Sequence, residues 1–114
     1  MTAAAVAENY FALSNARELE SVFDLFTADA TYSSDNTGLY YGVADIRRMM
    51  TAFFEAHPYL HWEVHALNLS TDHIVEIKFT LTARDSNGEE IIRPGIERIV
   101  ITQGKIRHVE VRNT

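Results

Sequence analysis

The sequence contains no cysteine among its 114 residues, which excludes disulfide bonds, thiolate nucleophiles and cysteine-ligated metal sites. Basic residues are also few: ten Lys and Arg stand against sixteen Asp and Glu, and the net charge is −6. Because nucleic-acid binding depends on a basic face, we expect no nucleic-acid partner. No apolar run approaches the roughly 18 residues of a membrane helix, so we expect no membrane partner. The N-terminal stretch MTAAAVAENYF lacks the basic segment of a signal peptide. We therefore expect a cytoplasmic protein.

The length and apolar content are sufficient for one folded domain. Apolar residues make up 46% of the chain, and neither a linker nor a repeat interrupts it. A chain of this size can bury a core without disulfides. We therefore expect residues 1–114 to form a single domain.

The first half of the chain has helical periodicity. Three apolar stripes recur at helical spacing: Val6, Tyr10 and Leu13; Leu19, Val22, Phe23 and Phe26; and Ile46, Met49, Met50 and Phe53. Asn15 followed by Glu18 fits a capping box at the start of the second helix. Between the second and third stripes, 30–34 has the length of a short strand, and 35–38 carries turn residues. The sequence predicts three helices, the last ending before Pro58.

After Pro58 the period changes to two, which is typical of strands with one buried face. A break in this alternation predicts a bulge near Ala66. The Asn87–Gly88 pair favours a hairpin turn. Pro94 followed by Gly95 predicts a bulge or an edge in the next long strand. Helices followed by an antiparallel meander indicate an α+β fold.

Four segments carry a resemblance to a known family: Tyr10, the run LFTADATY at 25–32, Gly42 with Ile46, and the run GIERIVITQGKI at 95–106. With them, the chain resembles the nuclear transport factor 2-like superfamily, and within it the SnoaL-like and ketosteroid-isomerase-like pocket proteins. The resemblance implies a cone-shaped α+β fold, with three N-terminal helices packed on a strongly curved antiparallel sheet. It also implies a cavity between helices and sheet, and a homodimer formed through the outer sheet face.

The resemblance suggests three catalytic residues. Ketosteroid isomerases use a tyrosine on the first helix, an aspartate base after the first strand and a protonated aspartate on a late strand. Tyr10 and Glu97 match the first and third positions. An alignment without a gap places Ser34 at the base position, whereas a gap places Asp35 there. The candidate catalytic set is Tyr10, Asp35 and Glu97.

Glu97 is also singled out by its position in the strand. It shares parity with Ile99 and Ile101, so its carboxyl is expected on the apolar inner face. Burial there raises the pKa of a carboxyl, and a neutral acid can donate a hydrogen bond to a developing oxyanion. Two alternatives remain open: Glu97 pairs with a cation such as Arg93, or the sheet is solvated at this point. For Tyr10, the alternative is a core tyrosine with any available partner.

The remaining candidates concern ligand and metal binding. Aromatic and aliphatic residues expected on inner faces predict a pocket for a flat apolar molecule, formed by Tyr32, Phe53, Phe54, Trp62, Ile99 and Val109. His61, Glu63 and His65 share one strand face, but the two histidines would stand about 13 Å apart along it. One ion cannot bind both histidines; at most one adjacent pair could bind it, with a third ligand from elsewhere. We expect a polar outer face or a dimer contact instead, with no metal and no cofactor.

Taken together, these patterns predict a pocket protein for a small hydrophobic molecule. If it is an enzyme, the expected chemistry is a cofactor-free isomerisation, cyclisation or dehydration by proton transfer next to a carbonyl. The alternative is a non-catalytic ligand-binding domain or a dimeric adaptor domain.

Overall fold

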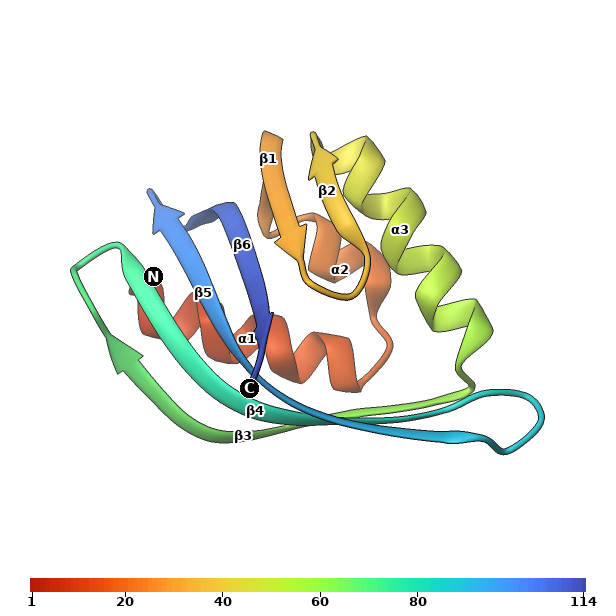
Figure 1. The fold of residues 1–114 in the computed structure, drawn as a ribbon. Coiled ribbons are helices and arrows are strands. Elements are labelled where there is room, and N and C mark those ends of the chain that lie inside the picture. Colours follow the sequence, from red (N-terminus) through yellow and green to blue (C-terminus); the bar gives the residue numbers. More distant parts are fainter.

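The computed structural model describes all 114 residues. The elements are α1 (Ala3–Asn15), α2 (Leu19–Phe23), β1 (Phe26–Ser34), β2 (Gly38–Tyr41), α3 (Val43–Ala56), β3 (Tyr59–Leu69), β4 (Ile74–Arg84), β5 (Glu90–Thr102) and β6 (Lys105–Asn113). The six strands form one sheet in the order β2-β1-β6-β5-β4-β3. This sheet curves around the helices, which lie on its concave side (Figure 1). The predicted α+β cone is confirmed, and all three helices precede β3.

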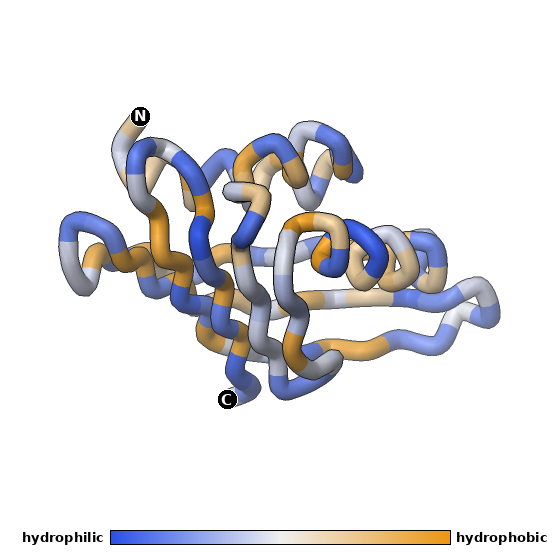
Figure 2. The backbone as a smooth tube through the Cα atoms, turned by 90° about the horizontal axis from the view of Figure 1, so that it is seen from above, coloured by the Kyte–Doolittle hydropathy of each residue, from blue (hydrophilic) through white to orange (hydrophobic).

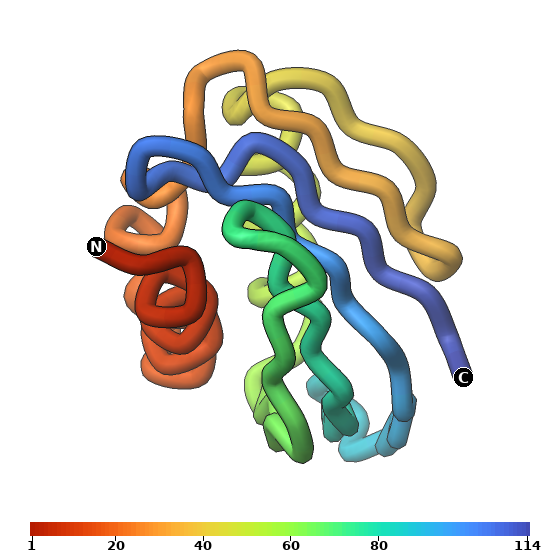
Figure 3. The backbone as a smooth tube through the Cα atoms, turned by 90° about the vertical axis from the view of Figure 1, so that its left-hand side faces the viewer, coloured from red at the N-terminus to blue at the C-terminus, as the bar shows by residue number.

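One pair of strands departs from the predicted antiparallel arrangement. β1 pairs with β6 in parallel, whereas every other neighbouring pair is antiparallel. These two strands are far apart in the sequence, and Figure 3 shows them running side by side along the curved sheet. Periodicity gives no information about such a long-range partner. The sheet is therefore mixed, although mostly antiparallel.

The core lies between the concave face of the sheet and the helices. Every second residue is buried along β4 and along β5 from Gly95 onward, and Figure 2 shows apolar and polar residues alternating along the strands. The helices contribute Val6, Phe11 and Ile46 to the same cluster of 22 buried apolar residues. Burial of this apolar surface is the main favourable term for folding. None of the three helices has the length and apolar character needed to cross a membrane.

Asn15 fastens α1 to the edge strand β3. Its amide oxygen accepts from the Trp62 backbone N–H at 2.8 Å, and its amide nitrogen donates to the Trp62 carbonyl at 3.0 Å. The predicted capping box is therefore wrong: Glu18 is the N-cap of α2 and no side chain caps it. An edge strand has unpaired backbone groups, and the Asn15 amide supplies what a neighbouring strand would.

Arg17 closes the C-terminus of α3. Its guanidinium donates to the carbonyls of Phe54 at 2.7 Å, His57 at 3.1 Å and Pro58 at 3.4 Å. It also lies 5.1 Å above the centre of the Phe54 ring. The last carbonyls of a helix lack intrahelical donors, so these bonds satisfy them and fix the position of α3 relative to α1.

The predicted irregularities of the sheet are found with one refinement. The register of β3 against β4 shifts between Val64 and Ala66, as predicted. At Pro94 no bulge forms, because β5 stays in register with β4 there. On its other side β5 pairs with β6 only from Gly95 onward, so Pro94 lies at an edge of β5. A Cβ atom on Gly95 would lie 2.8 Å from the Phe79 ring. The glycine thus allows that ring to pack directly on the strand backbone.

Candidate functional site

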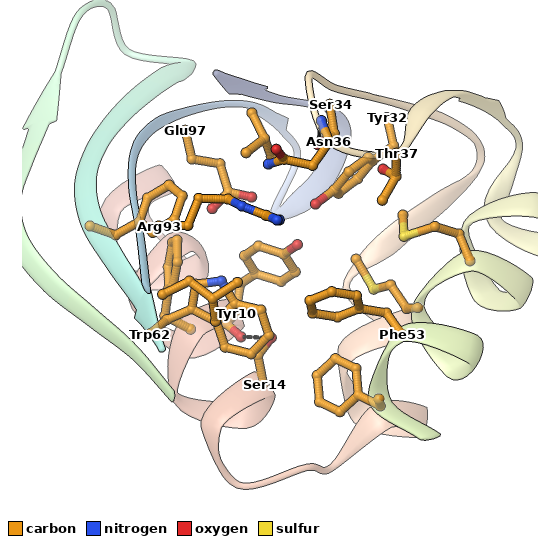
Figure 4. A pocket seen from close by; sticks show the side chains of 17 residues that line it. Tyr10, Ser14, Tyr32, Ser34, Asn36, Thr37, Phe53, Trp62, Arg93 and Glu97 are labelled. Atoms are coloured by element: carbon orange, nitrogen blue, oxygen red, sulfur yellow. Dashed lines mark hydrogen bonds between the residues drawn. The ribbon is translucent and has the colours of Figure 1, made fainter. Parts of the chain in front are cut away.

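A cavity opens between the concave sheet face, α1, α3 and the turn that joins β1 to β2 (Figure 4). Its atom-free space amounts to about 700 Å³ with the open mouth included, so the enclosed part is smaller. The lining is mainly apolar and comes from 17 residues: Tyr10, Phe11, Ser14, Tyr32, Ser34, Asn36, Thr37, Met49, Met50, Phe53, Phe54, Trp62, Phe79, Leu81, Arg93, Glu97 and Val111. An apolar cavity with few polar groups is the usual form of a small-molecule site.

Aromatic side chains form much of the wall. Phe53 and Phe54 come from α3 and Trp62 from β3. The rings of Phe54 and Trp62 are stacked, with their centres 5.7 Å apart and their planes at 29°. The backbone of Trp62 is held by Asn15, so this part of the wall is fixed to both α1 and α3. Such a surface suits a flat apolar ligand.

Glu97 is the only carboxyl of the lining. It lies on the inner face of β5 between the buried residues Gly95 and Ile99, and the residue is 3% exposed. Burial raises the pKa of this carboxyl from its ordinary value of 4.5 to about 8, and no cation is close enough to oppose the shift. Arg93, the alternative partner, forms no ion pair with it. At neutral pH Glu97 is therefore mostly a neutral acid, able to donate a proton or a hydrogen bond.

Two tyrosines face the same part of the cavity as Glu97. Tyr10 comes from α1 and Tyr32 from β1, and Figure 4 shows both side chains directed toward the interior with Glu97. Burial raises the pKa of each phenol, and the neighbouring Glu97 carboxyl raises it further. Both hydroxyls remain protonated donors at neutral pH. The Tyr10 ring is held in place by edge-to-face contacts with Phe11 and Phe26.

Asp35 lies outside this cavity. Ser34, the last residue of β1, lines it, whereas Asp35, the first residue of the following turn, is absent from the lining. The Asp35 carboxylate accepts from the Asn113 N–H at 3.0 Å and lies 3.8 Å from the Arg112 guanidinium. It joins the end of β1 to the end of β6. Its role as a base stays a prediction that the geometry does not favour, since the cavity is lined by Ser34 instead.

The predicted ligand-binding residues divide into two groups. Tyr32, Phe53, Phe54 and Trp62 line the cavity. Ile99 and Val109 do not: both are fully buried in the core. They have the inner parity that was predicted, but they lie farther along their strands, where the helices pack directly on the sheet.

Some cavity residues were missed by sequence reasoning as site residues. Arg93 has the same parity as Glu97 on β5, so the alternation placed it inside, although it was considered only as a partner for Glu97. Asn36 and Thr37 belong to the turn after β1, and periodicity does not reach turns. Ser14 lines the cavity from α1, with its hydroxyl donating to the Tyr10 carbonyl at 2.7 Å.

The histidines of β3 do not form a metal centre. His61, Glu63 and His65 lie on an exposed face, and His65 pairs with the Thr80 hydroxyl at 2.8 Å. No three His, Asp or Glu side chains cluster closely enough to hold an ion.

Comparisons with known proteins identify the family and the fold. Residues 7–109 match the SnoaL-like domain family. No protein of curated function matches the sequence. Among solved structures, an uncharacterised cystatin-fold protein from Novosphingobium aromaticivorans is 19% identical, with a TM-score of 0.86 and 98% of each chain covered.

Two further structures share the fold. A hypothetical protein with a ketosteroid isomerase-like fold from Catenulispora acidiphila is 14% identical, with a TM-score of 0.84, covering 94% of this chain and 83% of that chain. The epoxide hydrolase/cyclase-like enzyme SalBIII, described in pyran ring formation in the polyether salinomycin, is 18% identical, with a TM-score of 0.85, covering 96% and 88%. At these identities the likeness concerns the fold alone.

Proposed function

This chain belongs to the SnoaL-like domain family, and we propose that it binds a small, largely apolar carbonyl compound and transfers a proton next to the carbonyl. The reaction class is a cofactor-free isomerisation, cyclisation or dehydration. The observation that supports it is the buried Glu97 carboxyl, which opens onto an apolar cavity beside Tyr10 and Tyr32. Strongly perturbed carboxyls in cavities are characteristic of catalytic sites.

Within this proposal, Tyr10 and Tyr32 hold the substrate oxygen. Their hydroxyls are neutral donors at neutral pH and stabilise negative charge that develops on a carbonyl oxygen. The surrounding wall is apolar, so such hydrogen bonds are stronger than they would be in water.

Glu97 is the proton-transfer group. With Asp35 outside the cavity and no histidine or aspartate in the lining, Glu97 is the one acid–base group near a bound substrate. Its pKa of about 8 lies close to neutral pH, where a general base is most effective. In its ionised form it removes a proton from the carbon next to the carbonyl, the electron pair moves to the oxygen, and Glu97 then returns the proton at a second atom.

Hydrogen–deuterium exchange tests this assignment without knowledge of the natural substrate. The probe is 2-tetralone, a planar bicyclic ketone, and NMR follows exchange of its C–H groups next to the carbonyl in D₂O. Wild-type protein should accelerate exchange over buffer, and Glu97→Gln should lower that rate by about 10²-fold or more, as loss of a general base does.

Asp35→Asn is the matched control, because it makes the same chemical change outside the cavity. It should retain the wild-type rate. Loss of exchange in Asp35→Asn with retention in Glu97→Gln would instead identify Asp35 as the base and refute the assignment of Glu97.

A second candidate function is a ligand-binding domain without catalysis. One observation favours it: the lining has a single carboxyl and no second acid–base group to relay the proton. Trp62 is the only tryptophan and lines the cavity, so its fluorescence reports occupancy. Ligand-dependent quenching without any accelerated exchange would favour this candidate over the enzyme.

Three further assignments remain part of the proposal: a single domain over residues 1–114, a cytoplasmic location and a homodimer through the outer sheet face. The outer face supports a dimer because apolar side chains such as Ile92, which is 63% exposed, interrupt its charged residues. Gel filtration at micromolar concentration should give the mass of two chains.

A further inference from the structure

We propose that the ligand of this cavity is a carboxylic acid whose carboxylate binds Arg93. This inference rests on the proposed function and specifies its substrate class: a planar, largely apolar molecule with a carbonyl at one end and a carboxylate at the other. Arg93 would be a specificity-determining residue.

Arg93 differs from every other arginine of the chain in having no partner. The chain has eight arginines, and seven are engaged. Arg17 binds backbone carbonyls, and the others pair with carboxylates: Arg47 with Glu20, Arg48 with Asp45, Arg84 with Glu90, Arg98 with Glu76, Arg107 with Asp29 and Arg112 with Asp35. Acidic residues outnumber basic ones in this chain, sixteen to ten, so an arginine without a carboxylate partner is unexpected.

The position of Arg93 directs this free charge into the cavity. It shares the inner face of β5 with Glu97, it is partly buried, and Figure 4 shows its side chain among the lining residues. It is also the only cationic residue of the lining. Holding an unpaired guanidinium against an apolar wall costs free energy, and an anionic ligand group would offset that cost.

The single charge favours a carboxylate over a phosphate. A guanidinium binds a carboxylate through two parallel hydrogen bonds, and one positive charge neutralises one carboxylate. A phosphate dianion would retain uncompensated charge in a cavity whose other polar lining groups are neutral donors and Glu97. Ser34, Asn36 and Thr37 can complete the hydrogen bonds of a carboxylate without adding charge.

The spacing along β5 matches a ligand with two polar ends. Arg93 and Glu97 are four residues apart on the same strand face, which separates their Cα atoms by about 13 Å. The two side chains therefore enter the cavity from separate points of β5, so a ligand can place its carboxylate at Arg93 and its carbonyl toward Glu97. The aromatic wall formed by α3 and Trp62 would contact the apolar part of that ligand.

The test compares matched probes at pH 7: 2-naphthoic acid, its uncharged amide 2-naphthamide, and 2-naphthyl phosphate. Calorimetry measures affinity, and the indole N–H signal of Trp62 in NMR confirms that the probe occupies the cavity. Wild-type protein should bind the acid about 10-fold or more tightly than the amide, which is the effect of one charge-assisted pair.

Three variants complete the design. Arg93→Gln should remove the preference for the acid. It should bind the amide within about twofold of wild type, which also shows that the variant is folded. Arg93→Lys should retain part of the preference, because it keeps the charge but loses the planar guanidinium. Arg98→Gln, the same change on the outer face of β5, should retain the full preference.

The outcomes separate this inference from the proposed function. Equal affinity of wild type for acid and amide, or an unchanged preference in Arg93→Gln, would overturn the role of Arg93 and leave the pocket function standing. Tighter binding of the phosphate than of the acid would overturn the carboxylate assignment. If no probe binds wild type at millimolar concentration, the proposed pocket function fails, and this inference fails with it.

Discussion

Replacing Glu97 by Gln should stabilise the protein at neutral pH and remove a specific part of its pH dependence. The folded-state pKa of about 8 lies well above the ordinary value of 4.5. Between these two values the unfolded chain has released the Glu97 proton and the folded chain has kept it. Folding then requires uptake of a proton, so the stability contributed by protonated Glu97 is present below pH 4.5 and lost as the pH rises toward 8.

The magnitude follows from this interval. Each pH unit between the two pKa values lowers the free energy of unfolding by about 1.4 kcal/mol. From 4.5 to pH 7 the cost is about 3 kcal/mol for the wild type. A glutamine of similar size and hydrogen-bonding capacity does not ionise, so the Glu97→Gln protein should not lose this stability.

Urea unfolding at pH 5, 6, 7, 8 and 9 measures the difference between variant and wild type, in which all other titrating groups cancel. The difference should be small at pH 5, rise by about 1.4 kcal/mol per unit and level off above pH 8. Glu76→Gln is the control, because Glu76 lies on the neighbouring strand and pairs with Arg98 outside the cavity. In this variant the unfolding free energy should still fall with pH as Glu97 requires. A difference that does not change with pH would show that Glu97 ionises at an ordinary pKa, and the argument for a neutral acid would fail.

Two further predictions concern the walls of the cavity. In Gly95→Ala the new Cβ would lie 2.8 Å from the Phe79 ring and 2.9 Å from the Arg112 carbonyl oxygen, so both the ring and the β6 backbone must move. Urea unfolding should show a loss of about 1–3 kcal/mol; an unchanged midpoint would mean that ring and backbone both have room to shift. In Asn15→Ala the edge strand loses both hydrogen bonds to Trp62, which should cost about 1–2 kcal/mol and shift the Trp62 fluorescence maximum. A destabilised variant with unaltered fluorescence would contradict the role of Asn15 in positioning the cavity wall.

Local periodicity determined much of the architecture. Helical spacing located the three helices, and alternation located the four long strands, because both patterns depend only on neighbouring residues and the geometry of one element. The second stripe was extended too far, because Phe26 begins β1, which starts four residues before the predicted strand. For the same reason the alternation placed Glu97 on the inner face, and the apolar composition of that face predicted a raised pKa for its carboxyl. The resemblance to SnoaL-like proteins added Tyr10 as its neighbour.

The tertiary structure decided what depends on remote segments. Ser34 rather than Asp35 faces the cavity because β1 pairs with the distant β6, and Arg112 and Asn113 at the end of that strand bind the Asp35 carboxylate. Ile99 and Val109 have inner parity, yet helix packing fills the space above them.

Arg93 shows the same limit most clearly. Its parity was readable from the sequence, whereas its lack of a partner follows from the three-dimensional positions of all sixteen acidic residues. A repeating pattern fixes which face a side chain occupies, because the period belongs to the element itself. Only packing between elements decides whether that face borders a cavity, the core or an opposite charge, since those contacts join residues far apart in the chain.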